Sequence, residues 1–115
     1  MKFPSTDDFL QAFGIEPIEE DASLAYCRYV KRSSNGEVEL DISFGAASES
    51  FQITLRWNDQ DIMTMSSEKA TLIEIFNDHS GSGLRVIFDL SDVKSEAIVT
   101  LEPQLNCRWW TLRST

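Results

Sequence analysis

The sequence predicts a mainly β domain of the α+β class, with one short N-terminal helix before an antiparallel meander of seven or eight strands. Apolar and polar side chains alternate with a period of two, most clearly from Glu37 to Phe44. These β-rich runs are separated by turn residues at intervals of roughly ten residues, which is typical of a meander. Because a sheet of this size must bury one face, we expect a half-barrel or a two-layer sandwich.

A short amphipathic helix is predicted from Asp7 to Phe13. Ser5 can cap its first turn, and acidic residues there suit the helix dipole. Gly14 is placed to end it. We expect three of its side chains to face the core: Phe9, Leu10 and Phe13.

Seven or eight strands are expected after the helix, and the candidate segments cover residues 24–31, 37–44, 51–57, 62–65, 70–76, 84–90, 97–101 and 107–112. The Asn35-Gly36 pair between the first two is a strong signal for a hairpin. Ser67 could instead cap a helix that runs to Phe76. The β-branched residues Thr71, Ile73 and Ile75 favour a strand in that segment.

Length and composition predict a single domain, residues 1–115, that folds without disulfides or a structural metal. The chain has 115 residues, of which 42% are hydrophobic and 10% aromatic, so it can bury a real core. The N-terminus lacks the apolar stretch of a secretory signal, and no run is long and apolar enough to span a membrane. We therefore expect a cytoplasmic protein in which Cys27 and Cys107 are reduced thiols.

The charge is strongly acidic. Ten Lys and Arg residues stand against nineteen Asp and Glu, so the formal net charge is 10 minus 19, or −9. Binding to nucleic acid needs a basic footprint, and an anionic membrane surface also attracts cations. The charge argues against both partners and favours a basic protein, although it also promotes solubility by itself.

The alternation places an acidic stripe on one strand. Glu37, Glu39 and Asp41 would share the face turned to water, opposite the apolar residues of the same run. A cationic partner would turn their mutual repulsion into attraction. Acidic residues of the connector after the helix and of a later turn could join them, and one tryptophan completes the predicted partner-binding set: Glu19, Glu20, Glu37, Glu39, Asp41, Asp59, Asp61 and Trp110.

The tryptophan pair near the C-terminus gives a second indication of binding. Trp109 and Trp110 are adjacent in a predicted strand, so one should point inward and the other outward. Exposed aromatic residues often anchor protein interfaces. The alternative is that the outer ring is covered by the helix or by neighbouring aliphatic residues.

Catalytic and metal-binding patterns are weak. His79, the single histidine, lies beside Asp78 and Ser80 in a Gly-rich turn, which does not hold a catalytic triad rigidly. Asp59-Gln60-Asp61 lacks the glycine and the terminal glutamate of a calcium loop. We expect no enzyme activity, no metal and no cofactor.

The chain resembles bacterial immunity proteins of contact-dependent growth inhibition and other polymorphic toxin systems. The resemblance is one of type over the whole chain: small size, acidic balance, and a short helix before a meander that ends in Val99-Thr100-Leu101-Glu102-Pro103 and Trp109-Trp110-Thr111-Leu112. It implies a monomer that binds one cognate toxin domain, often a basic nuclease, and neutralises it by blocking its active site or the access to it.

Two other classes fit the sequence. An acidic secretion chaperone would wrap an effector segment, and it would be a dimer with a helix from Ser67 to Phe76. A small-ligand-binding β-barrel would have Trp57, Tyr26 and Tyr29 at its mouth and a sizeable internal cavity. Uninterrupted strands and close packing would favour the immunity protein.

Overall fold

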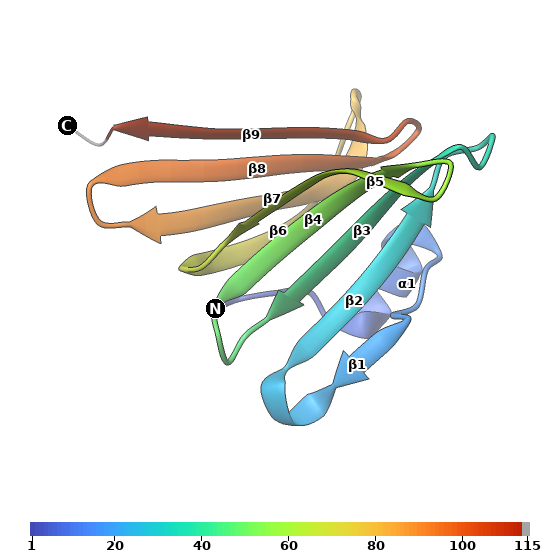
Figure 1. Cartoon of the computed structure of the whole chain (residues 1–115). Coiled ribbons are helices and arrows are strands. Elements are labelled where there is room, and N and C mark those ends of the chain that lie inside the picture. The colour runs from blue at the N-terminus through green and yellow to red at the C-terminus, as the bar shows by residue number, and fades with distance from the viewer. Residues whose placement is uncertain (114–115) are drawn as a thin grey trace.

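The computed structural model describes residues 1–113 and consists of two antiparallel sheets and one short helix (Figure 1). In chain order the elements are α1 (Thr6–Phe13), β1 (Glu19–Asp21), the 3-10 turn η1 (Ala22–Leu24), β2 (Tyr26–Arg32), β3 (Val38–Gly45), β4 (Ser50–Trp57), β5 (Gln60–Ser67), β6 (Ala70–Asp78), β7 (Gly81–Leu90), β8 (Val93–Glu102) and β9 (Asn106–Arg113). The mainly β class with one N-terminal helix is confirmed.

Strands that follow one another in the chain lie side by side, so each sheet is a meander. The first sheet has the order β1-β2-β3-β4-β5 and the second the order β6-β7-β8-β9. Among residues 1–113 no ladder joins the two sheets, so the described chain forms two layers and not a closed barrel. Residues 67–76, left open between strand and helix, belong to the end of β5 and to β6.

One strand was not expected. The acidic residues of the connector form β1, in which Glu20 pairs with Cys27 and Glu19 with Arg28 on β2. Three exposed acidic residues have low strand propensity, which is why the local sequence did not predict it. Pairing with β2 supplies hydrogen bonds that the short segment could not form alone. The sheets therefore hold nine strands in the described part of the chain, against seven or eight expected.

The helix and the first hairpin have the predicted local signals. Ser5 accepts a hydrogen bond from the N–H of Asp8, the Asp8 carboxylate accepts one from the N–H of Ser5, and Gly14 ends α1 at φ 67°. In the β2–β3 hairpin, Gly36 has φ 75°. Glycine adopts such positive φ angles without steric cost, which explains why it occupies both the C-cap of α1 and the hairpin loop.

The core lies between the two sheets and beneath α1. Phe9 of α1 stacks on Tyr29 of β2 with ring centroids 3.9 Å apart, and Phe51 of β4 meets Phe88 of β7 at 6.2 Å. Figure 1 shows α1 behind β2, and the strands β6 and β7 of the second sheet behind β4 and β5. Alternation thus placed the apolar residues of β3 correctly, since Leu40, Ile42 and Phe44 are all buried.

Two expected core residues are exposed. Leu10 is 45% exposed, because the buried face of the short helix is defined by Phe9 and Phe13, one helical turn apart, and Leu10 points away from it. Trp57, which the alternation from Phe51 to Trp57 predicts to face inward, is 50% exposed at the last position of β4. Both predictions were wrong, and both side chains are available to a partner.

The helices in residues 1–113 are too short and too polar to cross a bilayer.

Candidate partner-binding surface

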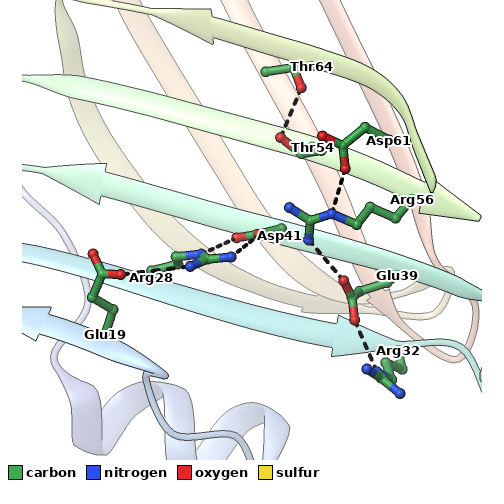
Figure 2. A network of polar contacts seen from close by, with 9 residues as sticks. All are labelled: Glu19, Arg28, Arg32, Glu39, Asp41, Thr54, Arg56, Asp61 and Thr64. Carbon is green, nitrogen blue, oxygen red and sulfur yellow. Dashed lines mark hydrogen bonds and ion pairs between the residues drawn. The ribbon is translucent and has the colours of Figure 1, made fainter. Parts of the chain in front are cut away.

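The outer face of the first sheet carries the predicted acidic stripe, but arginines from the flanking strands lie against it (Figure 2). Asp41 of β3 is opposite Val30 of β2 and Thr54 of β4. Side chains one pair further along the same face, Arg28 and Arg56, reach across to its carboxylate.

Asp41 is the centre of this arrangement. The Nε and Nη2 atoms of Arg28 donate to its two oxygens at 2.9 and 2.6 Å, and Nη1 of Arg56 lies 2.8 Å from Oδ2. The residue is only 7% exposed. The pKa of Asp41 is lowered, first by the hydrogen bonds from Arg28 and then by those from Arg56, despite the opposing effect of burial.

The other acidic residues of this face are also paired. Glu39 accepts hydrogen bonds from Arg32 at 3.0 Å and from Arg56 at 2.9 Å. Arg56 also donates to Asp61 of β5 at 2.7 Å, and these carboxylates raise its pKa. Glu19 of β1 completes the row, 3.7 Å from Arg28. We call these seven residues the ion-pair network: Glu19, Arg28, Arg32, Glu39, Asp41, Arg56 and Asp61.

The expected stripe in water is therefore not what the structure contains. Four carboxylates and three arginines leave the ion-pair network with a net charge of −1 (3 minus 4). Glu37 lies outside β3, in the exposed hairpin loop. The sequence pattern put Glu39 and Asp41 on one face correctly, but it did not show that the adjacent strands supply their counter-ions.

Unpaired carboxylates gather at another place, around α1 and β1. Residues 3–27 contain no Lys or Arg and six acidic residues: Asp7, Asp8, Glu16, Glu19, Glu20 and Asp21. Of these, within the described chain, only Glu19 forms an ion pair. Two thirds of the net charge of −9 therefore comes from these 25 residues.

A shallow recess lies within this acidic region. It has a volume of about 320 Å³ and is lined by Thr6, Asp7, Leu10, Glu16, Pro17 and Glu20. Apolar Leu10 and Pro17 are thus bordered by three carboxylates, and Ile18 close by in sequence is 59% exposed. We call Asp7, Leu10, Glu16, Ile18 and Glu20 the α1–β1 surface. Its chemistry suits a Lys or Arg side chain, whose stem packs on apolar atoms while its head meets carboxylates.

The predicted site residues are thus divided. Glu19, Glu39, Asp41 and Asp61 belong to the ion-pair network, whereas Glu20 belongs to the α1–β1 surface. Glu37 and Asp59 lie exposed in two loops that meet, since the N–H of Asn58 donates to the carbonyl of Glu37 at 2.9 Å.

Three residues of the α1–β1 surface were not among the predicted site residues: Asp7, Glu16 and Ile18. The long stretch without a cation was the signal that could have identified them.

The two adjacent tryptophans point to opposite faces, as predicted. Trp109 stacks on Phe88 at 5.0 Å, and its Nε1 donates to Ser95 at 3.0 Å. Trp110 is 36% exposed on the outer face of the second sheet, where it lines a recess of about 880 Å³ with Leu112 and Lys94. The residues that line this recess come from the second sheet and its turns and not from α1, so the exposed ring is accessible to a partner.

The histidine turn has ordinary turn chemistry. His79 stands in the β6–β7 turn, where Asp78 accepts a hydrogen bond from the N–H of Ser80 at 2.8 Å. Bonds from Ser80 lower the pKa of Asp78. Within residues 1–113, His, Cys, Asp and Glu side chains form no group of three that could hold a metal ion.

Comparison with known proteins gives a likeness of fold. No protein-family model and no curated protein matches the sequence. Among solved structures, the chain is similar to one in a contact-dependent growth inhibition toxin–immunity protein complex from Klebsiella pneumoniae 342, with a TM-score of 0.89 and 17% sequence identity. The superposition covers 96% of each chain. The two chains share a fold over almost their whole length.

Proposed function

We propose that this protein is an immunity protein, which binds a cognate toxin domain of a contact-dependent growth inhibition system and neutralises it. The observation that carries the proposal is the likeness of fold to a chain of a toxin–immunity protein complex. The type of sequence supports it independently, because the chain is small, strongly acidic and built as a helix followed by a meander.

Charge favours the inhibitor's role over the toxin's. A toxin that cuts nucleic acid needs cations for the phosphates, and this chain has a net charge of −9. The same charge is complementary to such an enzyme. We therefore propose a basic nuclease domain as the partner, which the acidic protein attracts at long range and then blocks.

The α1–β1 surface is the place where we propose that the toxin binds. Its carboxylates have no counter-ion in the described chain, so a basic partner meets them without first breaking internal ion pairs. Exposed Leu10 and Ile18 add apolar area that becomes buried on binding. Among the predicted site residues Glu20 lies there, and Glu37, Asp59 and Trp110 are further exposed candidates.

The other two classes have less support. The chaperone reading needed a helix at residues 67–76, and β5 and β6 occupy that segment. The barrel reading needed strands closed around a cavity, and the described strands form two separate sheets. Tyr29, expected at the mouth of such a barrel, is buried under Phe9.

Growth rescue tests the proposal. The gene next to the one for this chain is searched for a large secreted protein with a variable C-terminal domain, and that domain is expressed with and without this chain. We expect arrest of growth without it, rescue with it, and co-purification of the two proteins. Expression of this chain alone distinguishes an immunity protein, which lets the cells grow, from a toxin, which arrests them.

Three outcomes would contradict the proposal. Growth arrest by this chain alone would make it the toxin of the pair. Rescue without a stable complex would exclude neutralisation by binding. Failure of the chain to protect against the neighbouring toxin would remove the proposed role. A toxin that binds and is neutralised but has no nuclease activity would overturn only the proposal about the partner's chemistry.

A further inference from the structure

A groove runs between α1 and the edge strand β6. It has a volume of about 630 Å³ and is lined by Lys2, Phe3, Pro4, Asp8, Gln11, Ala12, Leu72, Ile73, Glu74 and Ile75. One wall is the side of α1 that carries Asp8 and Gln11. The opposite wall is formed by the backbone and side chains of β6, which is an edge strand of the second sheet in the described chain and pairs with β7 on the side away from the groove.

The N-terminal segment occupies just the beginning of this edge. Lys2 forms an isolated parallel bridge to Leu72: its N–H donates to the carbonyl of Thr71 at 3.0 Å, and its carbonyl accepts from the N–H of Ile73 at 2.8 Å. Pro4 and α1 then carry the chain away from β6. Within residues 1–113, no strand lies beside the rest of this edge.

The direction of the remaining backbone groups follows from alternation. Ile73 directs its N–H to Lys2, away from β7, so the residues two and four positions later, Ile75 and Asn77, direct theirs to the same side. Neither of these two N–H groups has a hydrogen-bond partner in the described residues. Backbone donors and acceptors at such an edge are a template for another strand.

We propose that an extended segment of the toxin enters this groove and adds to β6 as a further strand, continuing the line that Lys2 begins. The inference rests on the proposed function and goes beyond it, because it states the mode of binding. Main-chain hydrogen bonds to Ile75 and Asn77 would supply affinity, and the walls of the groove would select the side chains.

Charge indicates which occupant fits. In the groove itself, Glu74 is paired with Arg85 at 3.0 Å, and Lys2 lines it together with Asp8. The surplus negative charge comes from the adjoining residues 3–27, which carry six acidic residues and no Lys or Arg. A second copy of this chain would bring two such segments together and would meet like charge. A toxin segment with basic side chains meets opposite charge, so we commit to that occupant.

Residue-resolved amide hydrogen exchange tests strand addition. It is measured on this protein alone and in complex with the neighbouring toxin domain that growth rescue identifies. We expect the Ile75 and Asn77 amides to exchange at least about tenfold more slowly in the complex. The amides of Glu74 and Phe76 face β7, so they serve as internal controls that are protected in both states.

A blocking variant gives a second measurement. Gln11 is exposed on the α1 wall, and Gln11→Trp should fill the groove without touching the core. We expect it to weaken toxin binding at least about tenfold. Gln104→Trp is the matched control, since it makes the same change at an exposed position between β8 and β9, and it should bind as the wild type does.

The outcomes separate this inference from the proposed function. If rescue and complex formation occur but Ile75 and Asn77 exchange unchanged, strand addition is wrong and the immunity function stands. Wild-type binding by Gln11→Trp would lead to the same conclusion. If the free protein is already a dimer with both amides protected, the groove holds a second copy. If there is no rescue and no complex, both proposals fail.

Discussion

Arg28 and Asp41 form a two-point ion pair across β2 and β3, with Nε and Nη2 of the guanidinium 2.9 and 2.6 Å from the two carboxylate oxygens. Planar, bidentate contacts of this kind are stronger and more directional than a single contact. Because Asp41 is almost buried, the pair bears on stability more than on attraction of a partner.

Replacing the carboxylate should destabilise the sheet. Asp41→Asn leaves Arg28 and Arg56 side by side without the shared anion, and we expect a loss of about 2 kcal/mol in the free energy of unfolding. Urea denaturation measures it. Arg32→Met is the control, because Arg32 is exposed at the end of the ion-pair network and its loss should cost less than about 1 kcal/mol. Equal effects of the two variants would show that burial of Asp41 is unimportant.

The contribution of Asp41 to the free energy of unfolding should decrease at acid pH. Its pKa in the folded protein is lowered, chiefly by hydrogen bonds from Arg28, below the value of about 3.9 of an unperturbed aspartate. A carboxylate whose pKa is lower in the folded than in the unfolded protein stabilises the fold. This stabilisation is complete when the pH is above the pKa of the unfolded state, and it is lost as the pH falls to the pKa of the folded state. We expect the difference in unfolding free energy between wild type and Asp41→Asn to shrink below about pH 4. A difference that stays constant to about pH 2 would exclude ionisation as its source.

Gly83 should tolerate no side chain. A Cβ atom there would lie 1.9 Å from the carbonyl oxygen of Val99 and 2.8 Å from Cα of Thr100, where β7 and β8 are in irregular register. Backbone atoms must therefore shift, and Gly83→Ala should lower the unfolding free energy by about 1–3 kcal/mol. Ser82→Ala at the neighbouring position should change it by less than about 0.5 kcal/mol. Thermal or urea unfolding compares the two.

The acidic residues of the α1–β1 surface should control the rate of toxin association. The triple variant Asp7→Asn, Glu16→Gln, Glu20→Gln should associate about tenfold more slowly at low salt and show a weaker salt dependence. The control is a second triple variant with the same net charge, which removes three exposed acidic residues outside the α1–β1 surface: Glu68→Gln, Asp89→Asn, Asp92→Asn. Stopped-flow measurements compare them. If both triple variants slow association equally, net charge and not the α1–β1 surface is responsible.

Some of the counter-ions in the ion-pair network can be predicted from the sequence of a single hairpin. Arg28, Arg32 and Arg56 stand at outward positions of strands flanking β3, and the Asn35-Gly36 hairpin brings Arg32 opposite Glu39. Counter-ions within one hairpin follow from its register. The pairing of Arg56 with Asp41 needed the register of a second hairpin, whose loop residues 46–49 carry no comparable turn signal.

The sequence by itself determined the local structure: the capped helix, the alternation that buries Leu40, Ile42 and Phe44, and the acidic balance of the chain. Each depends on residues a few positions apart, so periodicity and capping are enough to predict it. Only the tertiary structure decided which carboxylates keep a surplus charge. Counter-ions come from neighbouring strands, and the open edge of β6 depends on where the N-terminal segment leaves it, so both are set by contacts between segments distant in sequence.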